Sequence, residues 1–175
     1  MRRVSIIGSG GAGKSTLARR LGDITGLPVI HLDAVHWKPG WSETPKDKWR
    51  KIVEALVAGE RWVIDGNFGG TMEIRLAASD TVIFLDFPRT LCLSRAVKRL
   101  FRYWNRNRPD MGEGCPERLD IEFLHWIWTF PNRAKPQIEA RLSALPPRVK
   151  VVRLTSPAAA DEFLSVVKCT NANGH

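Results

Sequence analysis

The chain has 175 residues, of which 43% are hydrophobic and 26% are charged, and its formal net charge is +9. A chain of this length buries about 70% of its unfolded surface, so one domain can fold without disulfide staples. The sequence has no apolar run of about 18 residues and no signal-peptide pattern, so we expect no association with a membrane. The basic charge indicates anionic partners, a class that includes nucleotides and nucleic acids.

The three cysteines, Cys92, Cys115 and Cys169, are scattered and show no C-x-x-C spacing. An odd number without a pairing pattern argues against a disulfide framework and against a zinc knuckle. We therefore expect the protein to work in a reducing compartment and to be cytoplasmic.

The first predicted elements are a strand over residues 4–7 and a helix over residues 15–24, and between them GSGGAGKS matches the phosphate-binding pattern G-x-x-x-x-G-K-[ST]. The glycines let successive backbone N–H groups point at phosphate oxygens, and the helix N-terminus adds about half a positive charge. The sequence therefore predicts a site for a nucleoside triphosphate, expected to be ATP. The expected binding residues are Gly8, Ser9, Gly10, Gly11, Ala12, Gly13, Lys14, Ser15 and Thr16.

We expect specific roles for three of these residues. Lys14 should bridge the β- and γ-phosphates, and the hydroxyl of Ser15 should be a ligand of Mg²⁺. Thr16 either touches the α-phosphate or only packs in the first turn of the helix.

Strands and helices alternate along the rest of the chain. Thr44 and Pro45 are a typical helix start, whereas Pro131 and Pro136 should bend or break the helix that precedes them. Strands are expected at residues 29–32, 61–65, 81–86 and 148–154, and helices at residues 45–58, 71–76, 88–105, 117–130 and 157–167.

This alternation predicts an α/β fold, with a five-stranded parallel sheet and helices on both faces. One P-loop, nucleotide-kinase-like domain should span residues 1–170, with a short arginine-rich lid at about 105–119 and a frayed tail at 171–175. In such sheets ligands bind at the carboxyl ends of the strands. Lys14, Asp33, Asp65 and Asp86 all lie at such ends.

The helix expected at 88–105 has two contrasting faces. Leu93, Val97, Leu100, Phe101 and Trp104 form an apolar stripe that should face inward, and basic residues occupy the other side. Between residues 86 and 110 there are seven basic residues and no acid. Like charges four residues apart cost a few tenths of a kcal/mol, so this face is either simply solvated or, as we favour, meets phosphate.

These segments together resemble the P-loop kinases of the adenylate-kinase type, and more closely the bacterial DNA-topology-modulation kinases related to them. The resemblance rests on the P-loop, the His31-Leu32-Asp33 segment with Trp37, the strand end at 63–67, the turn at 85–89, the arginine-rich helix and residues 123–127. It implies a five-stranded core and a lid that closes over phosphates. Only about 28 residues separate Asp33 from Arg61, so the long insertion that binds nucleoside monophosphates in adenylate kinases is missing. The acceptor pocket should be smaller or differently built.

Phosphoryl transfer mainly requires positioning and charge, which suggests roles for the remaining polar residues. Asp65, rather than Asp86, should hold a Mg²⁺-bound water beside Ser15, unless it merely caps a turn. Asp33 should orient or deprotonate an acceptor hydroxyl, unless it is a turn residue. Trp37 and Trp41 either stack on an acceptor or fill an apolar gap. The arginines expected to neutralise the migrating phosphoryl group are Arg99, Arg106, Arg108, Arg118 and Arg133.

The leading hypothesis is a kinase that moves the γ-phosphate of Mg-ATP to a small-molecule acceptor, with nucleotides and nucleosides as candidates. The alternative is an ATP-dependent nucleic-acid-binding protein that modulates DNA topology. The sequence has no helix-turn-helix, zinc-finger or RNA-binding signature, so we expect nucleic-acid binding to be weak at most. A GTPase switch is disfavoured because no N-K-x-D motif is present. We expect a monomer or a homodimer.

Overall fold

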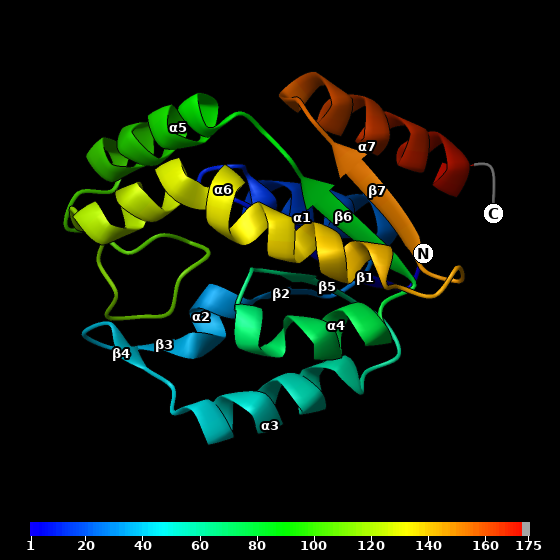
Figure 1. The fold of residues 1–175 in the computed structure, drawn as a ribbon, viewed down its shortest axis with the longest axis horizontal. Coiled ribbons are helices and arrows are strands. Elements are labelled where there is room, and N and C mark those ends of the chain that lie inside the picture. The colour runs from blue at the N-terminus through cyan, green and yellow to red at the C-terminus, as the bar shows by residue number, and fades with distance from the viewer. Residues whose placement is uncertain (173–175) are drawn as a thin grey trace.

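The structure is a computed structural model that describes residues 1–172. Five parallel strands form its central sheet in the order β2-β5-β1-β6-β7 (Figure 1). This arrangement confirms the predicted five-stranded parallel sheet. The strands are β1 (Arg3–Gly8), β2 (Val29–His31), β5 (Trp62–Asp65), β6 (Thr81–Leu85) and β7 (Lys150–Leu154).

The central position of β1 places the P-loop in the middle of the carboxyl edge of the sheet. On one side Ile6 pairs with Asp65 at the end of β5. On the other side Gly8 pairs with Leu85 at the end of β6. Asp65 and Asp86 therefore both lie next to the P-loop strand, on opposite sides of it.

Helices cover both faces of the sheet, as predicted (Figure 1). Alternate residues of a strand point to opposite faces. Accordingly, Ile6 packs in one core with residues of α1 and α7, and Ile7 packs in another core with residues of α4 and α6. The helices are α1 (Lys14–Thr25), α2 (Leu32–His36), α3 (Lys46–Val57), α4 (Met72–Ala78) preceded by the 3-10 turn η1 (Gly69–Thr71), α5 (Arg89–Arg102), α6 (Ile121–Ser143) and α7 (Pro157–Ala172).

Pro131 and Pro136 were expected to bend or break the helix that precedes them. A break is wrong, because α6 runs for 23 residues with both prolines inside it. A proline within a helix costs about 3 kcal/mol. Phe130 and Ile138, on either side of these prolines, are both buried in the same core. Each contributes about 1.5–3 kcal/mol through burial, so tertiary packing offsets much of the local cost.

The predicted apolar stripe of α5 is also wrong in part. Cys92, Ala96 and Leu100 form the buried face, whereas Phe101 and Trp104 are 76% and 51% exposed. The buried face of α5 approaches the P-loop closely. A Cβ atom on Gly11 would lie 2.1 Å from the carbonyl oxygen of Cys92, so residue 11 of the P-loop has no room for a side chain at this contact.

The segment after β2, between the strand predicted at 29–32 and the helix predicted at 45–58, contains the short helix α2 and a two-stranded antiparallel hairpin of β3 (Trp37–Lys38) and β4 (Ser42–Glu43). The last helix continues to Ala172 rather than ending at residue 167. The tail expected at 171–175 is therefore helical in its first two residues, and the rest of it lies outside the described residues. Within residues 1–172 no helix is both long enough and apolar enough to cross a membrane.

Candidate active site

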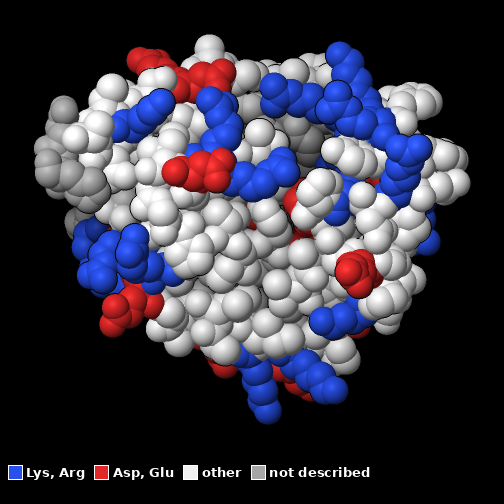
Figure 2. All heavy atoms as spheres, turned by 180° about the vertical axis from the view of Figure 1, so that it is seen from behind, with Lys and Arg blue, Asp and Glu red and all other residues white. Residues whose placement is uncertain are grey.

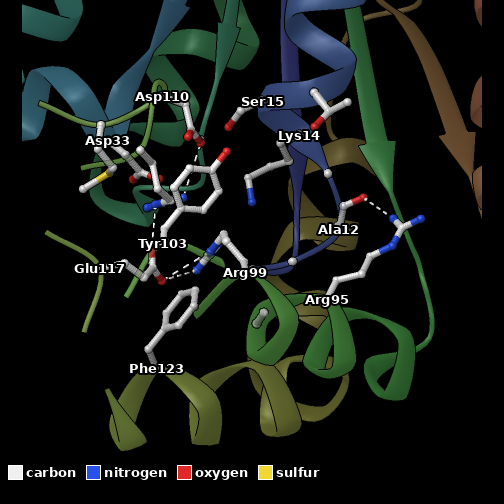
Figure 3. A pocket seen from close by; sticks show the side chains of 18 of the residues that line it. Ala12, Lys14, Ser15, Asp33, Arg95, Arg99, Tyr103, Asp110, Glu117 and Phe123 are labelled. Atoms are coloured by element: carbon white, nitrogen blue, oxygen red, sulfur yellow. Dashed lines mark hydrogen bonds and ion pairs between the residues drawn. The ribbon is translucent and has the colours of Figure 1, made fainter. Parts of the chain in front are cut away.

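A cavity of about 850 Å³ lies at the carboxyl edge of the sheet. Its walls come from the P-loop, α5, the hairpin of β3 and β4, and the segment 105–119, which we call the lid. Lys14, Asp33 and Arg99 come from three different elements and surround this same cavity (Figure 3). Sequence-predicted site residues among its lining are Gly10, Gly11, Ala12, Gly13, Lys14, Ser15, Thr16, Asp33, Arg99, Arg108 and Arg118.

The lysine of the P-loop folds back over the loop itself. Lys14 Nζ donates hydrogen bonds to the carbonyl oxygens of Gly8 at 3.0 Å and Ser9 at 2.9 Å. Burial lowers the pKa of the Lys14 ammonium, and the nearby carboxylates of Asp33 and Asp65 oppose this shift. These two carboxylates favour the charged form of Lys14 at the point where the motif places the phosphates.

Ser15 lines the cavity, and with Asp65, which is buried behind it, forms a pair that could hold a metal ion. Ser15 Oγ donates a hydrogen bond of 2.7 Å to Asp65 Oδ2, and His31 Nδ1 lies 2.6 Å from Asp65 Oδ1. This hydrogen bond raises the pKa of His31. No group of three or more acidic, histidine or cysteine ligands occurs among residues 1–172. A hydroxyl beside a carboxylate fits Mg²⁺, which takes few protein oxygens and completes its octahedron with water and phosphate.

Two residues that sequence reasoning missed hold this region together. Asn67 accepts a hydrogen bond from Gly8 N at 3.1 Å and donates one to Gly8 O at 2.7 Å, so the end of β5 is tied to the P-loop. Arg75 is fully buried and donates to the carbonyl oxygens of Gly66 and Asn67. Burial lowers the pKa of Arg75 to about 10. No local pattern marks Arg75, since its partners lie eight and nine residues away in a loop.

Asp33 marks the other side of the cavity, in the first turn of α2. Burial raises the pKa of Asp33, and the charges of Lys14 and Arg108 oppose this shift. Such a carboxyl is a better proton acceptor than an exposed aspartate. Trp37 and Trp41, in the hairpin, line the same part of the cavity with ring centroids 5.6 Å apart in an edge-to-face arrangement.

The lid closes against this hairpin. Gly40 N donates to Gly114 O at 2.8 Å, and Trp41 Nε1 donates to Pro116 O at 3.0 Å. Met111 and Cys115 are buried, which the composition of the lid did not lead us to expect. The tryptophan side of the cavity is therefore roofed by the lid.

The five candidate arginines separate into two groups. Arg99 and Arg108 lie in the cavity and form ion pairs with Glu117, and Arg118 lies over the Trp41 ring at 5.5 Å. Arg106 and Arg133 are exposed and do not line the cavity, because Arg106 lies in the turn after α5 and Arg133 on the outer side of α6.

Other basic side chains line the cavity, which Arg106 and Arg133 do not. Arg95 donates to the carbonyl oxygen of Ala12 at 3.4 Å, and Arg19, Arg20 and Arg102 also line the cavity. Arg95 and Arg102 are among the seven basic residues between residues 86 and 110, but neither was predicted as a residue of the site.

No protein-family model matches the chain, and a search of curated proteins gives no match. Solved structures do match, over nearly the whole chain. The shikimate kinase from Acinetobacter baumannii in complex with shikimate is 15% identical, with a TM-score of 0.57, and the match covers 99% of this chain and 95% of that chain.

Two further solved structures are also similar to this chain over nearly its whole length. A sugar kinase from Janibacter sp. is 22% identical with a TM-score of 0.52, covering 98% of this chain and 97% of that chain. A gluconokinase from Sinorhizobium meliloti is 14% identical with a TM-score of 0.52, covering 98% of this chain and 92% of that chain. The chain has the fold of the P-loop kinases. At these identities the likeness establishes the fold alone.

Proposed function

We propose that this protein is a kinase that transfers the γ-phosphoryl group of ATP, with Mg²⁺, to a hydroxyl group of a small molecule. The observation that carries this proposal is the convergence of three sets of groups on one cavity. These are the P-loop lysine, the pair of Ser15 and its hydrogen-bonded neighbour Asp65, and the half-buried Asp33 together with Arg99 and Arg108. The names of the structural neighbours, all kinases of small molecules, support the same class of activity.

The roles follow from charge and position. Lys14 would contact the β- and γ-phosphates, and Arg99 and Arg108 would stabilise the negative charge of the phosphoryl group during transfer. Ser15 and Asp65 would hold Mg²⁺, which neutralises phosphate charge when bound. Asp33 would accept the proton of the acceptor hydroxyl as its oxygen bonds to the γ-phosphorus and the bond to ADP breaks.

The acceptor would lie between Asp33 and the roof of the lid. Trp37 and Trp41 give this part of the cavity aromatic walls, which suit a flat or apolar face of the acceptor. Nucleosides and nucleotides remain candidates for this reason, beside the sugars and sugar acids that the structural neighbours suggest.

The test is ADP formation from Mg-ATP against a panel of nucleosides, nucleotides, sugars and sugar acids. At least one acceptor should raise ADP formation well above the rate without acceptor. Lys14→Ala should lower transfer by roughly 10²–10³, the cost of losing a charge contact to the transition state. Lys98→Ala is the matched control, because Lys98 is exposed on α5 and does not line the cavity. A Lys14→Ala protein with wild-type turnover would contradict the proposal.

A second candidate is ATP-dependent binding of nucleic acid, in line with the resemblance to DNA-topology-modulation kinases. The observation that favours it is the charge of the surface. Lys and Arg side chains gather at the upper right of Figure 2, the side on which α5 lies. Arg19, Arg20, Arg102 and Arg118 are exposed and also line the cavity. We favour the kinase because this charge surrounds the P-loop site.

A further inference from the structure

Glu117, near the end of the lid, is a buried carboxylate between two arginines, with only 7% of the residue exposed. Its Oε1 lies 3.2 Å from Arg99 Nη2, and its Oε2 lies 2.6 Å from Arg108 Nε. Figure 3 shows the pair with Arg99 at the edge of the cavity. Because Arg99 belongs to α5 and Arg108 to the lid, one carboxylate joins two separate segments of the chain.

The backbone of Glu117 is fixed as well. Its N–H donates to the carbonyl oxygen of Arg106 at 2.9 Å, and its carbonyl oxygen accepts from Asn105 N at 3.1 Å. Residue 117 is thereby bound to the segment that leaves α5. These hydrogen bonds hold the backbone of Glu117 beside the end of α5, so that its side chain stays within reach of Arg99.

The two arginines need such an anion. Burial and the like charge of Arg108 lower the pKa of Arg99, and Lys14 adds a third cation to the same cavity. Side chains with like charges would turn away from one another if no counter-ion held them. Glu117 uses one carboxylate oxygen for each guanidinium, so the two groups are held side by side.

These contacts do not occupy all the N–H donors of either guanidinium. A guanidinium carries five N–H donors. Arg99 donates to Glu117 through Nε and Nη2, and Arg108 contacts Glu117 through Nε and Asp110 through Nη1. Both therefore keep N–H groups that can bind phosphate oxygens.

We propose that Glu117 is a positioning residue for phosphoryl transfer, which holds Arg99 and Arg108 together so that both reach the transferring phosphoryl group. Glu117 does not contact the substrate and acts only through the two arginines. This inference rests on the proposed function. Charges that are already in place need no reorganisation during the reaction, and a displacement of about 1 Å costs about 10²-fold in rate.

The experiment compares E117Q and E117D with the wild type and with the control E113Q. Glu113 is an exposed glutamate of the same lid that forms no ion pair within residues 1–172. The probe is MgADP, alone and with aluminium fluoride, which mimics the phosphoryl group in transfer. Calorimetry gives the affinity of each complex without knowledge of the acceptor.

E117Q should weaken the aluminium fluoride complex roughly 10- to 100-fold, while the affinity for MgADP alone stays near that of the wild type. E117D keeps the counter-ion, so it should fold even where E117Q does not. Its side chain is one methylene shorter and cannot span both guanidinium groups, so its loss should be intermediate. E113Q should behave as the wild type.

A double-mutant cycle tests whether Glu117 acts through Arg99. In an Arg99→Ala background, E117Q should cost much less than it does alone. Equal losses in both backgrounds would overturn the inference, and so would wild-type binding by E117Q or by E117D. A wild-type protein that binds MgADP but gains nothing from aluminium fluoride would overturn the proposed function and this role together. A gain in the wild type that E117Q fully retains would overturn the role alone.

Discussion

Ser15 Oγ donates a hydrogen bond of 2.7 Å to Asp65 Oδ2, which joins the first turn of α1 to the end of β5. The pair exists because β5 is the direct neighbour of β1, with Ile6 opposite Asp65. Asp86, on the other side of β1, is instead held by Lys135 at 2.9 Å and by Arg153 at 3.4 Å. The two aspartates at the carboxyl edge therefore have different surroundings.

This difference predicts that removing the charge of Asp65 and removing the charge of Asp86 affect different properties. Asp65→Asn should raise the Mg²⁺ concentration needed for half-maximal activity by roughly 10- to 100-fold, as expected for a residue that orients a metal ion or its water. Asp86→Asn should lower the melting temperature by weakening two ion pairs and leave the Mg²⁺ requirement near that of the wild type. Mg²⁺ titrations of both variants decide this, and the reverse ranking would contradict it.

Asp33→Asn should stabilise the protein and impair its activity. Because burial raises the pKa of Asp33 in the folded state, its charge opposes folding at any pH above that value. The neutral asparagine avoids this cost. At pH 7 the melting temperature should rise by about 2–4 °C for each kcal/mol gained. The gain should shrink as the pH falls toward 3.8, the ordinary pKa of an aspartate, where both states bind the proton.

The same variant should lose roughly 10²–10⁴ in transfer to the acceptor, since a general base is missing. Its affinity for ATP should stay near that of the wild type, because Asp33 belongs to α2 and is not one of the P-loop groups that bind phosphate. Thermal unfolding across this pH range and ATP binding together test the assignment. An affinity for ATP that falls as far as the turnover would place Asp33 on the metal side or in a structural role.

The sheet and the P-loop could be predicted because their signals are local. Short apolar runs mark all five strands, and the parallel arrangement brings residues at the strand ends, such as Asp33 and Asp65, to one edge. The inward face of α5 could not be predicted from periodicity. The spacing of Phe101 and Trp104 fits a buried stripe, but the side of α5 that packs on the glycine backbone of the P-loop is the one with Cys92 and Ala96.

The residues that support the site could not be predicted from the sequence for a similar reason. Asn67, Arg75 and Glu117 act through partners in other segments of the chain, and no spacing rule connects them. From their charge alone, all arginines near the lid were equally good candidates for residues of the site. Arg99 and Arg106 differ only in whether the helix has ended, because Arg99 is still in α5 and faces the cavity.

Gly112→Ala should loosen the lid. A Cβ atom at residue 112 would lie 3.0 Å from Trp37 O and 3.1 Å from Ala34 O, and both are backbone atoms of the acceptor side. The lid would have to move outward by a few tenths of an ångström. We expect faster amide hydrogen exchange over residues 105–119 and a higher KM for the acceptor, because lids complete the site when they close.

Gly70→Ala is the matched control for this variant, since a Cβ atom at residue 70 would meet no atom within 4 Å. Its exchange and kinetics should equal those of the wild type. In the wild type, a non-hydrolysable ATP analogue together with acceptor should increase protection of the lid. Strong protection of the lid that is equal with and without ligands would show that residues 105–119 do not act as a lid.

The basic surface should serve nucleotide phosphates before nucleic acid. The arginines concerned line the cavity that contains Lys14, so DNA and ATP would compete for the same cations. Double-stranded DNA should then bind weakly, lose affinity steeply as salt increases because binding mainly releases counter-ions, and be displaced by saturating ATP. A DNA titration at two salt concentrations, each with and without ATP, measures all three effects. Tight binding at physiological salt that persists or strengthens with ATP would instead favour the nucleic-acid function, because it requires a surface separate from the nucleotide site.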